Sequence, residues 1–231
     1  MSEIITFPEP DTMSIDFAYA EHSTVVLEDD FDKRKIYIRN AYGSDKLVII
    51  RTVKSPDIFI MNCESLLIVG ENLESEIIGS IKVIGSIGHL AVKRLKVHSG
   101  VIGLHMSQHY GTEKYGSIVI RDCQFYSHQK EGVYIGKSDG NASAPAIDSI
   151  EIEDSIFTLN GWDGLQTGRS FQTKINRCII TGNALDRKTY QDYDLTINPK
   201  SVFTYIDDCQ IGSIQHLDSG RLFIKRTIIG G

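Results

Sequence analysis

The sequence predicts an all-β protein that folds as a right-handed, single-stranded parallel β-helix, a solenoid of roughly eight to nine coils. Three observations lead to this prediction. A short frame recurs along the chain, in which an aliphatic residue is followed by two mostly polar residues and then by a small or apolar one. Alternating runs rich in β-branched residues lead into the frames, and Gly, Asn and Asp bound them. The chain shows no helical stretch, so units that each hold several strands must stack as coils.

The chain is expected to form one elongated domain. Residues 1–35 lack the frame and contain Pro8, Pro10 and the acidic run 28–30, so we expect an N-terminal cap or starting coil there. Residues 36–231 are expected to form the parallel β-helix. Its first coils are irregular, and the regular register begins near His89.

All four cysteines occupy the last position of the frame, at Cys63, Cys123, Cys178 and Cys209. The same position holds Leu95, Ser155 or Thr227 in other copies. The position therefore requires a small or apolar side chain rather than a thiol, and we expect free, buried cysteines that fill space. Only cysteines on adjacent coils, such as Cys178 and Cys209, would lie close enough to form a disulfide. The sequence contains no CxxC motif or paired histidines beside the cysteines that would support a metal site.

The spacing of the frames is that of a repeat with loops of variable length, because successive copies begin 18 to 32 residues apart. A second motif keeps the same register, since the segments 131–136 and 163–168 align without a gap. In both coils the turn glycine, Gly132 or Gly164, follows the start of the frame at the same distance. Looser copies occur at 102–107 and 193–198. The frames begin at Val92, Ile120, Ile152, Ile175, Ile206 and Ile224.

Polar, turn-rich loops interrupt the coils at 107–115, 137–146 and 182–192. The chain ends at Gly231 directly after a strand, without the polar cap that an end repeat usually has. An uncovered last coil exposes a strand edge. We therefore expect either that a partner chain or a second copy covers this end, or that the chain is truncated there.

Composition narrows the range of partners. The formal net charge of −6 and the pI near 5.6 argue against a nucleic-acid partner, which would require a basic face. No apolar stretch approaches the length of a membrane span, so no membrane partner is expected. The first ten residues lack the pattern of a secretory signal. Either a leader has been removed, or the protein acts without classical secretion.

The repeated Ile-x-x-Cys-x-Phe unit, the segment 131–136 and the segment 160–168 together resemble a known superfamily. They are similar to the right-handed parallel β-helix repeat proteins of the pectate-lyase-like superfamily, in particular the secreted bacterial type, over residues 36–229. That superfamily includes polysaccharide lyases, hydrolases, epimerases, phage tailspikes and adhesins, so the resemblance implies a fold and does not select a reaction. It implies an extracellular, cell-surface or virion location.

The register predicts an outward row of side chains next to the turn glycines. Its members are His105, Tyr134, Gln166 and Thr196, a strip of polar and aromatic groups suited to lying along a sugar chain. Trp162 offers a further stacking surface for a sugar ring, and Lys200 adds a cation. The competing interpretations are a solvated sheet face and a tryptophan that packs over its own coil.

Charged residues flank this row on both sides, with Glu131, Asp163 and Asp194 on one side and Lys137, Arg169 and Lys200 on the other. In a polysaccharide lyase the acidic residues would hold Ca²⁺, and Lys137 or Arg169 would remove the proton α to a uronate. A hydrolase would instead use Glu131 and Asp163 as its carboxyl pair. The alternative is structural, because acids before a turn glycine commonly serve the turn itself. No cofactor other than this calcium is expected.

Taken together, these observations favour a non-catalytic rod that binds a polysaccharide or glycan, or that serves as an adhesive or structural subunit of a cell surface or virion. The alternative is a polysaccharide lyase or related enzyme that acts on an anionic polysaccharide.

Overall fold

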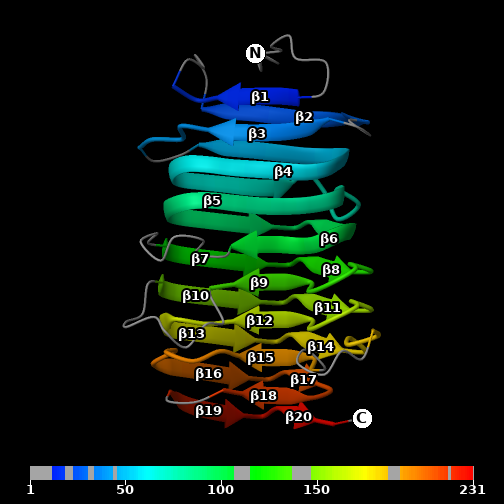
Figure 1. Ribbon diagram of the computed structural model, residues 1–231, viewed down its shortest axis with the longest axis vertical. Coiled ribbons are helices and arrows are strands. Elements are labelled where there is room, and N and C mark those ends of the chain that lie inside the picture. The colour runs from blue at the N-terminus through cyan, green and yellow to red at the C-terminus, as the bar shows by residue number, and fades with distance from the viewer. Residues whose placement is uncertain are drawn as a thin grey trace.

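The computed structural model describes residues 12–18, 23–30, 34–43, 46–106, 115–136, 147–186, 193–217 and 220–230. These residues form one elongated stack of parallel strands (Figure 1). The prediction of an all-β parallel β-helix is confirmed. The described part of the chain contains no helix able to cross a lipid bilayer.

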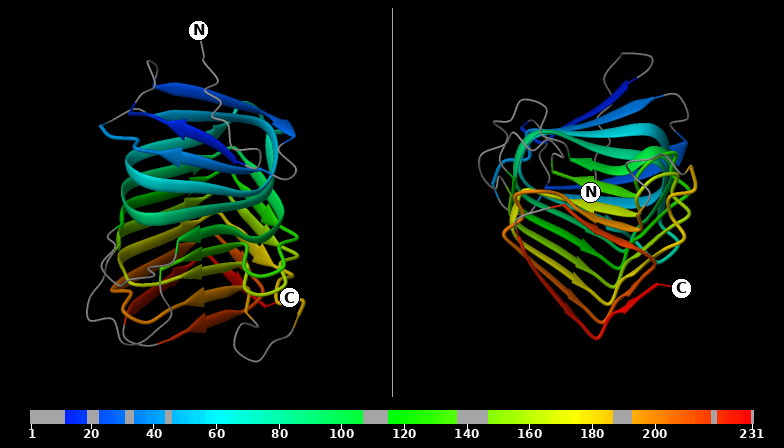
Figure 2. Two further views of the ribbon diagram at one scale, coloured as in Figure 1. Left: turned by 45° about the horizontal axis from the view of Figure 1, so that its top comes forward. Right: turned by 60° about the horizontal axis from the view of Figure 1, so that its bottom comes forward.

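Each coil contributes to three faces, which meet at angles around a narrow interior (Figure 2). Face A is formed by β1 (Thr12–Asp16), β3 (Lys35–Arg39), part of β4 (Leu47–Gly70), part of β5 (Glu76–Lys93), part of β6 (Lys96–Met106), β9 (Val133–Ile135), β12 (Leu165–Thr167), β15 (Leu195–Ile197) and β18 (Ile214–His216).

The other two faces are built in the same way. Face B contains β2 (Thr24–Asp30), β7 (Tyr115–Arg121), β10 (Ile147–Glu153), β13 (Ser170–Asn176), β16 (Phe203–Asp207) and β19 (Arg221–Lys225), with segments of β4 and β5. Face C contains β8 (Gln124–Tyr126), β11 (Ile156–Thr158), β14 (Ile179–Thr181), β17 (Gln210–Ile211) and β20 (Ile228–Ile229), with segments of β2, β4, β5 and β6.

Aliphatic rows fill the interior. On face B, Val92, Ile120, Ile152, Ile175 and Ile206 stack in register and are at most 1% exposed. Because strand residues alternate between the two sides, every second residue of each strand enters this interior. Burial of one such side chain contributes about 1.5 to 3 kcal/mol. The frame therefore marks the end of each face B strand, where the chain turns into the next corner.

The backbone takes the same sharp turn after each of these frames. The residue before the last frame position has a φ between 45° and 55° in every copy from Leu95 onward. A non-glycine residue with a backbone in this left-handed region is uncommon. This conformation lets the chain change direction sharply. The residues concerned are Arg94, Asp122, Asp154, Arg177, Asp208 and Arg226.

The corner position itself forms a ladder of hydrogen bonds between coils. Its residues are Leu95, Cys123, Ser155, Cys178, Cys209 and Thr227. The N–H of Cys123 donates to Ser155 Oγ (3.2 Å), and Cys209 N–H donates to Thr227 Oγ1 (3.4 Å). Each hydroxyl or thiol in turn donates to the carbonyl two residues earlier, as Ser155 does to Glu153 (2.7 Å). The corner position thus favours a small side chain that can both accept and donate a hydrogen bond.

The cysteines are free and buried, as expected. Cys63 shares the local geometry of the frame, because Asn62 has a φ of 53° and the Cys63 thiol donates to the Met61 carbonyl (3.4 Å). Its stacking differs from the prediction, however, because Cys63 pairs with Ile87 and not with Leu95. The register with the later frames passes instead through Ile68, which pairs with Val92. The cause is the position of this copy in the coil: Ile60 pairs with Ile38 and Val83 on face A, whereas the later frames end strands of face B.

We expect Cys123→Ser to change the free energy of unfolding by no more than about 1 kcal/mol, because Ser155 already makes the same bonds one coil later. Cys123→Phe should cost about 3 kcal/mol, because the interior leaves no room for a ring. Urea denaturation followed by circular dichroism measures both values. Equal losses in the two variants would contradict the role assigned to this position.

Candidate functional site

The strand register brings the predicted row together on face A. His105 pairs with Tyr134, Tyr134 with Gln166, and Gln166 with Thr196. The row continues to Gln215 of β18, which the sequence motifs did not reveal. We call His105, Tyr134, Gln166, Thr196 and Gln215 the polar row. Strands β9, β12, β15 and β18, which carry most of it, lie one below the other in Figure 1.

The upper part of the polar row is open. The rings of His105 and Tyr134 are partly exposed and lie 5.5 Å apart between centroids, tilted by 37°. Their chain neighbours Leu104 and Val133 are fully buried. Alternation along each strand therefore directs the two rings to the outer side of the coil, as the register predicts.

The lower part of the row is covered, although the sequence predicts an open strip. Gln166 is 3% exposed and Thr196 is 2% exposed. Gln166 Nε2 donates to Asn198 Oδ1 (3.2 Å), and Asn198 follows β15 directly. Burial depends on what the rest of the chain places over a strand, and the alternation of residues carries no such information.

Several polar atoms of this covered part have spare hydrogen-bonding capacity. Gln166 Oε1, Thr196 Oγ1, Asn198 Nδ2 and Gln215 Oε1 are buried and have no partner among the described residues. We call these four residues the amide cluster. An unmade hydrogen bond to a buried polar group costs about 1 to 3 kcal/mol, and folded proteins leave few such groups. These four atoms lie in three adjacent coils, at the covered part of the row.

The acidic flank is part of the interior. Glu131 and Asp163 are 3% and 0% exposed, and Asp163 Oδ1 accepts the N–H of Tyr193 (3.2 Å). Burial raises the pKa of Glu131 to about 7, and the nearby Asp163 carboxylate acts in the same direction. Among the residues that the structure describes, no three His, Cys, Asp or Glu side chains gather as a metal site would require.

Asp194 belongs to a second ladder, which the sequence analysis missed. Its Oδ1 accepts the backbone N–H (3.0 Å) and the side-chain amide (2.9 Å) of Asn183, and its Oδ2 accepts the Ser213 hydroxyl (3.1 Å). Asn183 Oδ1 accepts the N–H of Asn160 in the coil before, and Asn160 Oδ1 accepts that of His128. The signal was present, because His128, Asn160 and Asn183 each lie five residues after a corner position.

His128 begins this ladder as a buried neutral ring. Its Nδ1 accepts the N–H of Gly100 (3.2 Å), and its Nε2 donates to the carbonyl of Val97 (3.0 Å). Burial lowers the pKa of His128 to about 4. The His128 ring therefore holds the backbone of Val97 and Gly100 in the coil before it, and its burial closes it to a ligand.

The basic flank is not a row of open cations either. Arg169 is only 5% exposed and has a φ of 54°, and its carbonyl accepts the N–H of Ile147. Lys200 is exposed, with a φ of 67°. Lys137 lies outside the described residues. The structure thus places one of the two candidate bases in the interior.

Trp162 is partly covered by the coil before it and not by its own coil. The Lys130 ammonium lies 4.5 Å from the centre of the indole ring, and the Trp162 N–H donates to the Lys130 carbonyl. One indole face therefore already has a partner, which leaves at most the other for a ligand.

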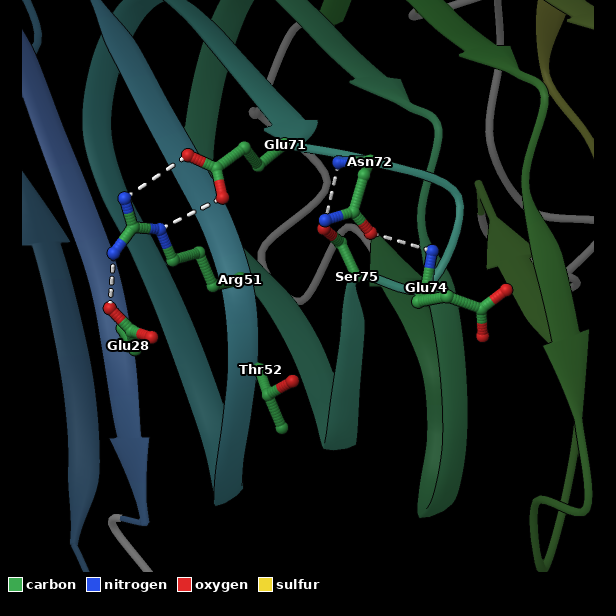
Figure 3. Close-up of a pocket in the computed structure, with 7 residues that line it drawn as sticks. All are labelled: Glu28, Arg51, Thr52, Glu71, Asn72, Glu74 and Ser75. Atoms are coloured by element: carbon green, nitrogen blue, oxygen red, sulfur yellow. Dashed lines mark hydrogen bonds and ion pairs between the residues drawn. The ribbon is translucent and has the colours of Figure 1, made fainter.

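A separate hollow of about 310 Å³ lies at the corner between faces B and C near the N-terminal coils (Figure 3). Arg51 in its wall donates from Nε (2.9 Å) and Nη2 (3.2 Å) to Glu71 and from Nη1 to Glu28. Asn72 and Ser75 are bonded to each other across the adjoining turn. The charges that line the hollow thus clamp neighbouring coils together, and the arrangement offers a ligand little.

An exposed line of aromatic rings runs over face B. Tyr205 and Phe223 lie 4.9 Å apart between centroids at 9°, and Phe171 is 57% exposed. Because the rings of Tyr205 and Phe223 cover one another, each leaves little free face for a sugar. This aromatic line is the second candidate binding surface beside the polar row.

Comparison with family models, curated proteins and solved structures finds no match to this chain. The fold and the site define a class: an all-β parallel solenoid with a continuous polar row on the outer side of one face.

Proposed function

We propose that this protein is a non-catalytic β-helix that binds a glycan along the polar row. The observation that carries the proposal is the register, which gives every coil from β6 to β18 one polar or aromatic side chain in the same outer row. Coils repeat about every 4.8 Å. A linear sugar polymer laid along the axis would meet such a surface at regular intervals.

The chemistry of the row suits carbohydrate. Aromatic rings provide an apolar surface for the C–H faces of sugars, and amide and hydroxyl groups pair with sugar hydroxyls. His105 and Tyr134 supply the first kind of contact on the open part of the row, and the partly exposed Gln215 supplies the second.

A binding role is favoured over a lyase or hydrolase. Glu131 and Asp163 are buried, both oxygens of Asp194 are bonded to the ladder, and Arg169 is buried. An acid or base must reach the proton that it transfers, and these four groups do not line the open part of the row. A binding rod of this kind fits an adhesive or structural subunit of a cell surface or virion.

The proposal is tested by titrating the protein with dextran, xylan, pectate, alginate and chondroitin sulfate. Tyr134→Ala should weaken the binding of the best of these about tenfold, which corresponds to about 1.4 kcal/mol. Tyr205→Ala, on the aromatic line of face B, is the matched control and should bind normally.

Three results would contradict the proposal: no binding to any of these polysaccharides, equal losses in the two variants, or loss only in Tyr205→Ala. A rise in ultraviolet absorbance from unsaturated products during incubation with pectate or alginate would establish the lyase alternative instead.

A further inference from the structure

Cys178 and Cys209 lie next to each other at the corners of two adjacent coils. On both sides of this corner the strands pair with the same offset, β13 with β16 and β14 with β17, so the two cysteines occupy equivalent positions one coil apart. Parallel strands of a sheet lie about 4.8 Å apart. A disulfide requires two Cα atoms separated by about 4.4 to 6.8 Å. The stacking of the coils thus places the two cysteines within the range of a disulfide.

The side chains of the pair interact as well. The N–H of Cys178 donates to Cys209 Sγ (3.4 Å), and the two thiols share a hydrogen bond. The bond from the Cys178 thiol lowers the pKa of Cys209, whereas this bond and burial raise the pKa of Cys178. Cys209 is therefore the thiol of the pair that ionises first, and the thiolate is the reactive form of cysteine.

The other two cysteines have no sulfur beside them. Cys123 lies between Leu95 and Ser155 in the corner ladder, and its N–H donates to the Ser155 hydroxyl. Cys63 pairs with Ile87 in the next coil. All four thiols are free and buried. Burial is therefore common to the four, and a neighbouring thiol distinguishes the pair from the other two.

We propose that Cys178 and Cys209 form a disulfide when the protein meets a peroxide, and that this bond ties the two coils together. The Cys209 thiolate attacks one oxygen of hydrogen peroxide, and the O–O bond breaks to leave a sulfenic acid and water. Cys178 Sγ then attacks Cys209 Sγ, the S–O bond breaks, and a second water leaves. The two thiols lose two electrons in total, and one hydrogen peroxide is reduced to two water molecules.

A small oxidant suits this corner, because Cys178 is 1% exposed and Cys209 is 4% exposed. The bond closes a segment that contains β14, β15 and β16, and with it the Thr196 and Asn198 side chains of the amide cluster. A closed segment has fewer conformations in the unfolded chain, which stabilises the folded state. The inference does not depend on the proposed glycan binding.

The test treats the folded protein with hydrogen peroxide, digests it without reduction and analyses the peptides by mass spectrometry. A peptide pair that joins Cys178 to Cys209 should appear, and dithiothreitol should remove it. The number of thiols that react with iodoacetamide after denaturation should fall from four to two, with Cys63 and Cys123 still reactive. The midpoint of urea denaturation should rise by about 1 M and return on reduction.

Serine variants provide the matched controls, because Ser155 already occupies the same corner position. Cys178→Ser and Cys209→Ser should show neither the link nor the rise in the urea midpoint, whereas Cys123→Ser should respond to peroxide as the wild type does. Four reactive thiols after treatment of the wild type, loss of thiols without this link, or a link through Cys63 or Cys123 would overturn the inference. A link that leaves the urea midpoint unchanged would overturn it too, because the bond would not hold the coils together.

Discussion

Glu131→Gln is expected to stabilise the protein by about 3 kcal/mol at pH 8 and to leave its stability at pH 4 nearly unchanged. Burial is the main cause, because it raises the pKa of the Glu131 carboxyl from 4.5 to about 7. At neutral pH the folded protein must either hold a proton on this group or bury a charge. Glutamine has nearly the same shape and carries no charge.

The sign follows from the proton balance. Between pH 4.5 and pH 7 the unfolded chain releases the proton of Glu131, whereas the folded protein keeps it. The wild-type contribution is therefore fully present below pH 4.5 and is lost as the pH rises to about 7. Urea denaturation at intervals from pH 4 to pH 8 measures the difference between the two proteins. Curves that stay parallel over this range would show that Glu131 is ionised in the fold.

His128→Gln is expected to have the opposite pH dependence. Burial lowers the pKa of His128 from 6.5 to about 4, so the unfolded chain takes up a proton between these values while the folded protein does not. The wild type therefore has the full contribution of His128 above pH 6.5 and loses about 3 kcal/mol as the pH falls to about 4.

The variant lacks this titration. It should be less stable than the wild type at pH 7, because it gives up the buried ring and its bonds to Gly100 and Val97. The deficit should shrink by about 3 kcal/mol as the pH falls from 6.5 to 4. Chemical denaturation over this range measures the deficit. A constant deficit would mean that the folded protein accepts the proton on His128.

These two groups oppose each other over a shared range. From pH 4.5 to 6.5 the Glu131 contribution falls with rising pH while the His128 contribution rises. Their sum should be nearly flat in the wild type, and each single variant should reveal the slope of the other group. The double variant should be flat again, which provides the control for both predictions.

Much of the fold could be predicted from the sequence because its repeat is a local property. The spacing from Ile120 to Gly132 recurs from Ile152 to Gly164, and the coils stack in that register. The same logic failed for the stacking of Cys63, because the same local frame recurs at Ile60 on face A, and the pattern of residues does not reveal which face of the coil a frame ends.

The candidate site was predicted less well. Alternation identified which side chains of β9, β12 and β15 point outward, and it also identified the row. Exposure depends on the coils and connections that cover a strand, so the burial of Gln166, Asp163 and Arg169 could not be read from spacing. From the sequence, Glu131 and Asp163 are candidate catalytic or calcium-binding residues. The structure buries both side chains.

The repeated left-handed corners allow the length of the rod to change by whole coils. At three of the described corners a backbone N–H donates to the hydroxyl or thiol in the next coil: Cys123 to Ser155, Cys178 to Cys209, and Cys209 to Thr227. A coil inserted or removed between two such junctions leaves an equivalent junction behind. In-frame duplication of one repeat can therefore lengthen the molecule by one step, and with it the stretch of ligand that the molecule can span, without redesign of its interior.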